Sequence, residues 1–160
     1  PAFKKDGSVT AGNASGINDA GAAVVLMEAG AAAKAGAKPL ARLVAYAHAG
    51  VEPHIMGEGP IPAVQKVFQK AGLKPSDMDV IESNEAFAVQ AMTVTKGLGL
   101  DPAKVNPNGG AVALGHPIGA TGAILTVKCL YELQRTGGKY GLVTMCIGGG
   151  QGIAAIFERL

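Results

Sequence analysis

Segments with strand and helix character alternate along this 160-residue chain, and the alternation limits the folds open to it. We predict strands at 40–47, 79–82, 110–114, 141–145 and 153–157, and helices at 18–35, 62–71, 86–98 and 116–135. Alternating strands and helices usually build a mostly parallel sheet with both faces covered. The short glycine link before the last strand favours an antiparallel pair there. The predicted fold is therefore α/β, with a mixed five-stranded sheet covered by helices.

Composition indicates one main globular domain. Apolar residues make up 48% of the chain and charged residues 16%, so it can bury enough surface to offset the entropy lost on folding. The net charge is only +2 and the basic residues are scattered, so we expect neither a nucleic acid nor a membrane as partner. The most apolar stretch, 20–37, is interrupted by Glu28, Lys34 and glycines, so it should not span a membrane.

The two cysteines, Cys129 and Cys146, match no disulfide framework or zinc-ligand spacing. We therefore expect no metal site and a reducing compartment, with the cytoplasm as the default. Cys129 lies inside an apolar helical segment and should be a packing residue. We expect no signal peptide, and the turn-like start at Pro1 suggests that an N-terminal portion is missing.

Several reactive side chains should meet at one edge of the sheet. A helix follows each of the first three predicted strands, so the loops that leave these strands emerge at the same edge. Ligands of open α/β sheets bind outside the carboxyl ends of the strands. The loop with Met56 and the turns at Asn84 and His116 should lie there, with Cys146 at the end of a strand parallel to them.

The run Gly-His-Pro-Ile-Gly-Ala-Thr-Gly at 115–122 surrounds His116 with glycines. Pro117 restricts the His116 backbone to extended values, and the following residues should open a helix. An imidazole here can act as a base near neutral pH or donate a hydrogen bond to an oxyanion. A histidine that only bonds backbone carbonyls in a tight turn fits the same sequence.

The run Cys-Ile-Gly-Gly-Gly-Gln-Gly at 146–152 places Cys146 at a strand end beside a second set of glycines. Glycines let backbone N–H groups approach a ligand, and such donors would favour thiolate over thiol. Cys146 is therefore a candidate nucleophile or general acid. A buried structural cysteine is the alternative, since cysteine is among the most buried residue types.

A third polar turn, Asn-Glu-Ala-Phe-Ala at 84–88, lies where a strand leads into a helix. The Asn84 amide could hold a water molecule or a substrate carbonyl, while Glu85 would favour the helix N-terminus. A pure capping role is the alternative. The segment 12–16 could likewise be a simple turn.

Four motifs together resemble the C-terminal half of a thiolase, most of all the biosynthetic acetyl-CoA acetyltransferases and β-ketothiolases. They are Asn-Ala-Ser-Gly-Ile-Asn-Asp at 13–19 and the three runs at 84–88, 115–122 and 146–152. The resemblance covers the whole chain in order. It implies that residues 1–39 are the tail of the loop region and the last elements of the N-terminal half, and that residues 40–160 form the C-terminal domain.

The resemblance implies a catalytic role for four residues. His116 would be the base that activates the nucleophilic cysteine. Cys146 would exchange a proton with the acetyl α-carbon or the leaving thiol. Asn84 would hold a water that forms one oxyanion hole with His116, and the backbone N–H of Gly148 would contribute to a second.

The same resemblance implies how the substrate is bound. Ser15 would lie along the pantetheine arm of coenzyme A. Met56 and Phe87 would line the acyl pocket, and Ala86 would also belong to the substrate-binding surface. No cofactor is implied, because coenzyme A thioesters are themselves the substrates.

The implied activity is the reversible Claisen condensation of acetyl-CoA with an acyl-CoA, and thiolysis of 3-ketoacyl-CoA, in fatty acid or polyhydroxyalkanoate metabolism. Such an enzyme would be a cytoplasmic homotetramer that binds CoA and acyl-CoA. In the family the acyl-accepting cysteine belongs to the N-terminal half, and these 160 residues contain no such motif. The chain would need that half to be active.

Two other functions fit the residues. The chain could be a non-catalytic half that binds coenzyme A or has a structural role beside a partner chain. Alternatively, Cys146 and His116 could form a Cys–His dyad for hydrolytic acyl transfer. One departure from the family is Glu58, where a neutral residue is usual, so the acyl pocket or the tetramer loop near Met56 would differ.

Overall fold

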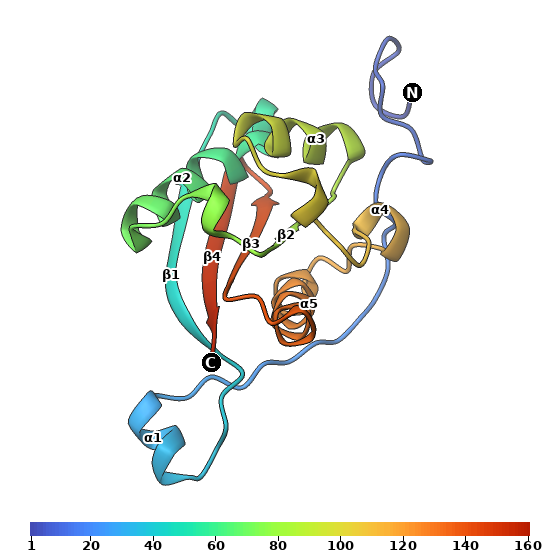
Figure 1. The fold of residues 1–160 in the computed structure, drawn as a ribbon. Coiled ribbons are helices and arrows are strands. Elements are labelled where there is room, and N and C mark those ends of the chain that lie inside the picture. The colour runs from blue at the N-terminus through green and yellow to red at the C-terminus, as the bar shows by residue number, and fades with distance from the viewer.

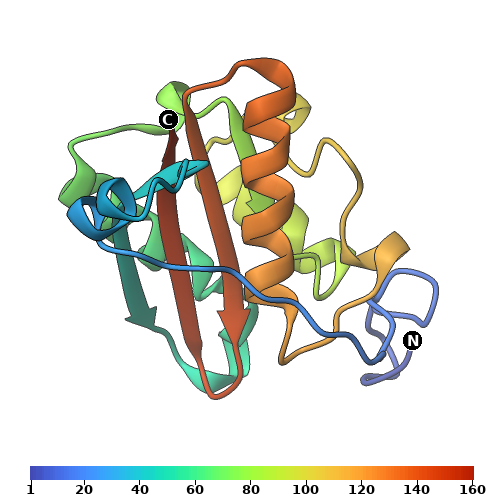
Figure 2. The same ribbon diagram turned by 90° about the horizontal axis from the view of Figure 1, so that it is seen from below.

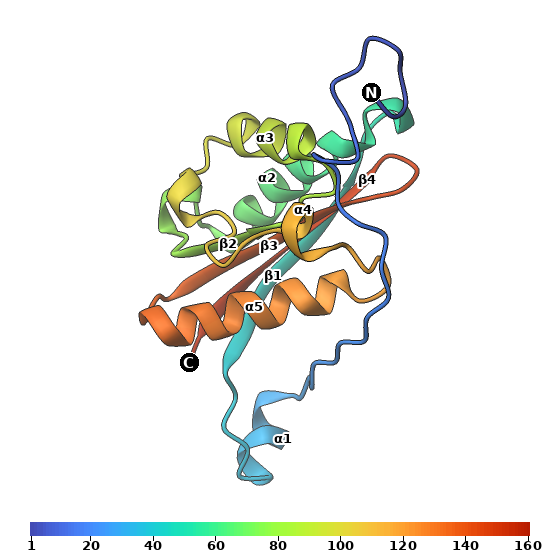
Figure 3. The same cartoon turned by 90° about the vertical axis from the view of Figure 1, so that its right-hand side faces the viewer.

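The computed structural model describes residues 1–160 as a sheet with helices on both sides (Figure 1). The strands are β1 (Ala41–Gly50), β2 (Val80–Ser83), β3 (Tyr140–Ile147) and β4 (Gln151–Arg159). The α-helices are α1 (Ala29–Lys34), α2 (Pro60–Ala71), α3 (Ala88–Gly97), α4 (Ala111–Leu114) and α5 (Thr121–Thr136). Three short 3-10 helices are η1 (Pro53–Glu58), η2 (Pro75–Asp77) and η3 (Pro102–Lys104). Helices α2 and α3 lie on one side of the sheet and α5 on the other (Figure 3).

Three of the four strands run in the same direction, although only one pair is parallel. In the order β1-β4-β3-β2, β2 is parallel to β3, whereas β4 is antiparallel to both of its neighbours. The carboxyl ends of β1, β2 and β3 therefore meet at one edge. The α/β class, the mixed sheet and the antiparallel pair at the end of the chain are confirmed, with Cys146 opposite Gly152 in that pair.

The prediction of a fifth strand at 110–114 is wrong, because Ala111–Leu114 forms the short helix α4. The segment before α4, at residues 105–106, lies along the free edge of β2 instead. Val105 forms a parallel bridge with Ile81, and the N–H of Asn106 donates to the Ile81 carbonyl at 2.7 Å. The sheet therefore has four strands.

The predicted helix at 18–35 is also mostly wrong, since only Ala29–Lys34 is helical. The Glu28 carboxylate accepts from the N–H groups of Gly30 and Ala31, at 2.8 and 2.9 Å, and so starts α1 late. Residues 17–28 form neither helix nor strand and run past α5 to α1 (Figure 2). They are exposed, and a short helix with no packed face is only marginally stable. No helix in the structure is both long and apolar enough to span a membrane.

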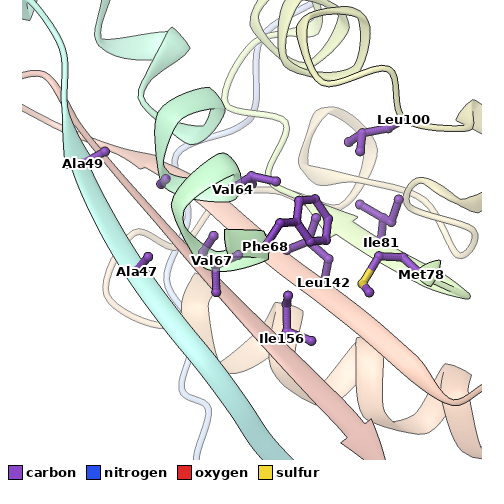
Figure 4. Packing of buried hydrophobic residues seen from close by; sticks show 12 residues of the cluster. Ala47, Ala49, Val64, Val67, Phe68, Met78, Ile81, Leu100, Leu142 and Ile156 are labelled. Atoms are coloured by element: carbon purple, nitrogen blue, oxygen red, sulfur yellow. The ribbon is translucent and has the colours of Figure 1, made fainter. Parts of the chain in front are cut away.

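Apolar side chains hold helices on both faces of the sheet. Helix α2 packs on β1, β3 and β4 through one core, which includes Val64 and Phe68 and also Ile81 of β2 (Figure 4). Helix α5 packs on β2 and β3 through a second core, in which Cys129 is fully buried, as predicted for a packing residue. Leu142 belongs to the first core and Val143 to the second, because successive side chains of a strand point to opposite faces.

Two glycines let the start of α2 lie directly against β4. A Cβ on Gly59 would overlap with the Gln151 carbonyl, and a Cβ on Gly152 would overlap with the Gly59 carbonyl. The two backbones are therefore in contact. This contact places the end of η1 beside the turn between β3 and β4.

We predict that Gly152→Ala lowers the free energy of unfolding by about 1–3 kcal/mol or more, because an added methyl group would overpack two rigid backbones. Urea unfolding followed by circular dichroism measures the change. Gly119→Ala is the matched control, since a Cβ at Gly119 would meet no atom within 4 Å. Equal loss of stability in the two variants would contradict the proposed cause.

Candidate active site

The turn at Asn84 lies at the edge where β1, β2 and β3 end. Asn84 follows β2 directly, and its N–H extends the parallel ladder by donating to the carbonyl of Thr144 in β3, at 3.0 Å. Its side-chain Nδ2 lies 3.4 Å from Nε2 of His116, whereas the buried Oδ1 has no hydrogen-bond partner. The structure therefore brings together Asn84 and His116, which the sequence placed at the same edge.

His116 reaches this edge from the loop between α4 and α5. Its N–H donates to the Gly16 carbonyl at 3.1 Å, and its ring Nδ1 lies 2.7 Å from the Thr121 hydroxyl oxygen. The residues after His116 lead into α5, as predicted. Burial lowers the pKa of His116 below its ordinary value, because desolvation disfavours the charged ring. The imidazole is therefore neutral at pH 7 and can accept a proton.

The segment that contains Ser15 is bound to the same turn. Ser15 donates from its N–H and from its hydroxyl to the Ala86 carbonyl, at 3.1 and 3.0 Å. Ala14 pairs with Phe87 in a short antiparallel bridge. These bonds hold Ser15 against Ala86 and Phe87, which follow Asn84 in the chain by two and three residues.

Met56 lies in η1, which follows the carboxyl end of β1. The neighbouring Gly57 carbonyl accepts from Nε2 of Gln90 in α3, at 3.1 Å, so η1 is bonded to the helix that follows Phe87. The Phe87 ring packs edge-on against Phe3, with ring centroids 6.0 Å apart. The predicted acyl-pocket residues Met56 and Phe87 thus come from elements that are joined to each other.

Cys146 lies near the carboxyl end of β3, two residues after Thr144, whose carbonyl bonds Asn84. The residue is 8% exposed, and burial raises the pKa of its thiol more than a backbone hydrogen bond lowers it. The expectation that backbone donors favour the thiolate is therefore wrong for this chain, because desolvation is the larger effect. Cys146 forms no hydrogen bond with His116 or Asn84, so a direct meeting of thiol and imidazole stays a prediction.

The glycines after Cys146 have different roles. Gly150 has a φ of +89°, and its carbonyl accepts from the N–H of Val51 at 2.7 Å, so it joins the β3–β4 turn to the end of β1. Gly152 touches Gly59, as described above. In contrast, a Cβ on Gly148 would meet no atom within 4 Å, and the Gly148 N–H donates to no atom of the chain. Gly148 therefore keeps a free backbone donor close to Cys146 in sequence.

Asn106, which the sequence did not single out, fastens the strand that carries Asn84. Its Oδ1 accepts from the N–H of Ser83 at 2.9 Å, and its Nδ2 donates to the Ser83 carbonyl at 2.8 Å. Asn106 is the one non-glycine residue with a positive φ, +48°, a conformation that asparagine adopts more readily than most residues. The run Asn-Pro-Asn-Gly-Gly at 106–110 signals a turn, but nothing in it signals a partner for β2.

The expected role of Glu85 at the N-terminus of the helix after Asn84 is wrong. Its carboxylate accepts from the N–H of Val112 at 3.1 Å and from Nδ2 of Asn106 at 3.3 Å, so it bonds the start of α4 instead. A Cβ on Gly110 would overlap with this carboxylate, which explains why position 110 is a glycine. Helix α3 begins without a side-chain cap.

Comparison with known protein families identifies the class to which this chain belongs. Residues 37–159 match the family model described as "Thiolase, C-terminal domain", and residues 1–30 match "Thiolase, N-terminal domain". The chain belongs to the thiolase family.

The relatives are longer than this chain. The beta-ketothiolase BktB of Cupriavidus necator is 68% identical to it over 161 residues, and the acetyl-CoA acetyltransferase of Escherichia coli is 60% identical over 160 residues. Each match covers 100% of this chain but 41% of the relative.

Two solved structures are similar in fold as well as in sequence. The acetyl-CoA acetyltransferase of Bacillus anthracis matches with a TM-score of 0.98 at 54% identity. Human mitochondrial 3-ketoacyl-CoA thiolase in complex with CoA matches with a TM-score of 0.93 at 49% identity. Both matches cover 100% of this chain and 41% of the other chain.

We predict that Asn106→Gly lowers the free energy of unfolding by about 1–3 kcal/mol. Glycine keeps the positive φ without strain, but the buried N–H and carbonyl of Ser83 lose their partners. Asn108→Gly is the control, because the exposed Asn108 donates only one side-chain bond, to Glu132. Thermal unfolding of both variants measures the difference, and an equal effect would show that Asn106 does not fasten β2.

We predict that the two thiols of the folded protein react slowly with iodoacetamide at pH 7. Burial raises the pKa of both, that of Cys129 to about 12, and the thiolate is the reactive form. As the pH rises, Cys146 should be labelled before the fully buried Cys129, and in urea both should react at the rate of an ordinary thiol. Mass spectrometry of the labelled peptides measures the order, and faster native labelling of Cys129 would contradict it.

Proposed function

We propose that this chain is the C-terminal part of an acetyl-CoA C-acetyltransferase that condenses acetyl-CoA with an acyl-CoA and, in reverse, thiolyses 3-ketoacyl-CoA. The observation that carries the proposal is the contact of the Asn84 amide with a neutral His116 imidazole, beside the segment that contains Ser15. The names of the relatives point the same way, since they are a beta-ketothiolase and acetyl-CoA acetyltransferases.

The N-terminal part of the full-length protein would supply the cysteine that carries the acetyl group. Residues 1–39 would be the last elements of that part, and residues 40–160 the C-terminal domain. Exposed apolar side chains between 17 and 27 support this division, because Ile17 is 99% and Val25 is 89% exposed without such a partner.

His116 would act first as a base. Its neutral ring would take the proton of the nucleophilic thiol and so generate the thiolate that attacks acetyl-CoA. Once protonated, the ring would donate a hydrogen bond to the oxygen of the enolate. The Asn84 amide, through a water, would be the second donor of this oxyanion hole, because preorganised donors stabilise charge that develops during the reaction.

Cys146 would first give its thiol proton to the coenzyme A thiolate that leaves during acetyl transfer, and the resulting Cys146 thiolate would remove the α-proton of the second acetyl-CoA. A thiol with a raised pKa is the conjugate acid of a strong base, which suits a weakly acidic C–H group. The resulting enolate carbon attacks the acetyl thioester, the new C–C bond forms, and the nucleophilic cysteine leaves as thiolate. The free N–H of Gly148 would stabilise the oxygen of the tetrahedral intermediate.

Coenzyme A and its thioesters would be the only small molecules required, with no cofactor. Ser15 would lie along the pantetheine arm, and Met56, Ala86 and Phe87 would line the acyl pocket. The assembled enzyme would be a cytoplasmic homotetramer in fatty acid or polyhydroxyalkanoate metabolism. The two free cysteines fit a reducing compartment.

We predict that Cys146→Ala in the full-length protein lowers the rate of condensation by about 100-fold or more, because the base for the α-proton is lost. Transfer of a labelled acetyl group onto the nucleophilic cysteine should remain detectable. Cys129→Ala is the matched control. It should leave the rates of both reactions unchanged, because Cys129 packs inside the α5 core. Loss of both reactions in Cys146→Ala would contradict the division of labour between Cys146 and His116.

Trapping the acyl group on the full-length protein separates this function from its alternatives. After denaturation and proteolysis, the proposed function places the label on a cysteine N-terminal to this chain. Label on Cys146 would instead support the hydrolytic Cys–His dyad. No label at all, with coenzyme A still bound, would support a non-catalytic module.

A further inference from the structure

A chain of hydrogen bonds runs from Asn84 through His116 into the first turn of α5. Nδ2 of Asn84 faces Nε2 of His116 at 3.4 Å, and Nδ1 on the other side of the ring faces Oγ1 of Thr121 at 2.7 Å. The Thr121 hydroxyl in turn donates to the Pro117 carbonyl at 3.0 Å. Thr121 is 3% exposed, so water does not compete for these bonds.

The hydrogen-bond donors along this series determine which ring nitrogen of His116 carries the proton. The Thr121 hydroxyl donates its one hydrogen to the Pro117 carbonyl, so its oxygen accepts from Nδ1 of His116. A neutral imidazole has one N–H group, which then lies on Nδ1 and donates to Thr121. Every donor in the chain then has an acceptor.

We propose that Thr121 is a positioning residue that holds His116 in the tautomer with the proton on Nδ1, so that Nε2 is the basic nitrogen at the site. This proposal rests on the proposed function, because Thr121 contributes to catalysis only if His116 is the base. It adds a residue whose hydroxyl touches no substrate but orients the base. The arrangement resembles other catalytic histidines, in which the group bonded to Nδ1 sets the tautomer.

Neutron diffraction from crystals of the full-length protein at pH 7.5 tests the proton position directly. The expected result is a deuterium on Nδ1 of His116 that points to Oγ1 of Thr121, with none on Nε2. A deuterium on Nε2 with a bare Nδ1 would overturn the proposal, because Thr121 would then be the donor. This measurement uses the unmodified protein, so it does not depend on whether a variant folds.

Kinetics of Thr121 variants in the full-length protein test the consequence. Thr121→Val keeps the shape and removes the hydroxyl, and it should lower kcat of thiolysis by about 10- to 100-fold, part of the factor that a general base contributes. The KM for acetoacetyl-CoA should change less than about twofold, because Thr121 does not touch the substrate. Thr121→Ser keeps the hydroxyl and should restore kcat to within about threefold of the unmodified protein.

Thr126→Val is the matched control on the same helix. The Thr126 hydroxyl donates to the Gly122 carbonyl at 2.8 Å, the same bond to the residue four positions earlier, but it does not contact His116. The kcat of the Thr126→Val variant should stay near that of the unmodified protein. If Thr121→Val behaves like Thr126→Val, or if Thr121→Ser is as slow as Thr121→Val, Thr121 does not position the base.

The failure of this proposal can be told apart from the failure of the proposed function. An unmodified full-length protein with neither condensation nor thiolysis would overturn the function, whereas the neutron result would still decide where His116 carries its proton. An active protein with its deuterium on Nε2 would keep the function and remove the role of Thr121.

Discussion

The site depends on the parallel pairing of β2 with β3. This ladder continues past β2 to the N–H of Asn84, which bonds Thr144 two residues before Cys146, so one set of backbone bonds places two of the proposed catalytic residues. Asn106 completes the other edge of β2 by bonding both backbone groups of Ser83. A four-residue strand with bonds along both edges holds the Asn84 turn more rigidly than a loop would.

Close backbone contacts, rather than loop flexibility, bring the remaining segments to this edge. The contact of Gly59 with Gly152 and the bond between Val51 and Gly150 place η1 against the β3–β4 turn. Such contacts tolerate no side chain, which explains Gly150 and Gly152 in the glycine run after Cys146. The glycine run therefore brings β1 and η1 to the proposed catalytic edge of the sheet, and it also leaves the N–H of Gly148 free.

Burial sets the protonation state of both proposed acid–base groups. Desolvation lowers the pKa of His116 and raises that of Cys146, so each group is neutral near pH 7. A neutral imidazole can take a proton from a thiol, and a protonated Cys146 becomes a strong base once it loses its own. One physical cause thus prepares two residues for different steps. The hydrogen bonds around His116 then decide which ring nitrogen is used.

Local sequence patterns determined much of this protein. They predicted α2 and α5, the antiparallel final strands and the edge at which Asn84 and His116 meet. Only contacts between distant segments make residues 111–114 helical, because the Glu85 carboxylate that bonds the start of α4 lies 27 positions away in the sequence. The tertiary structure also decided that residues 17–28 stay without regular structure, since no core lies beneath them. Periodicity and caps act over a few residues, whereas hydrogen bonds between distant segments and burial leave no local signal.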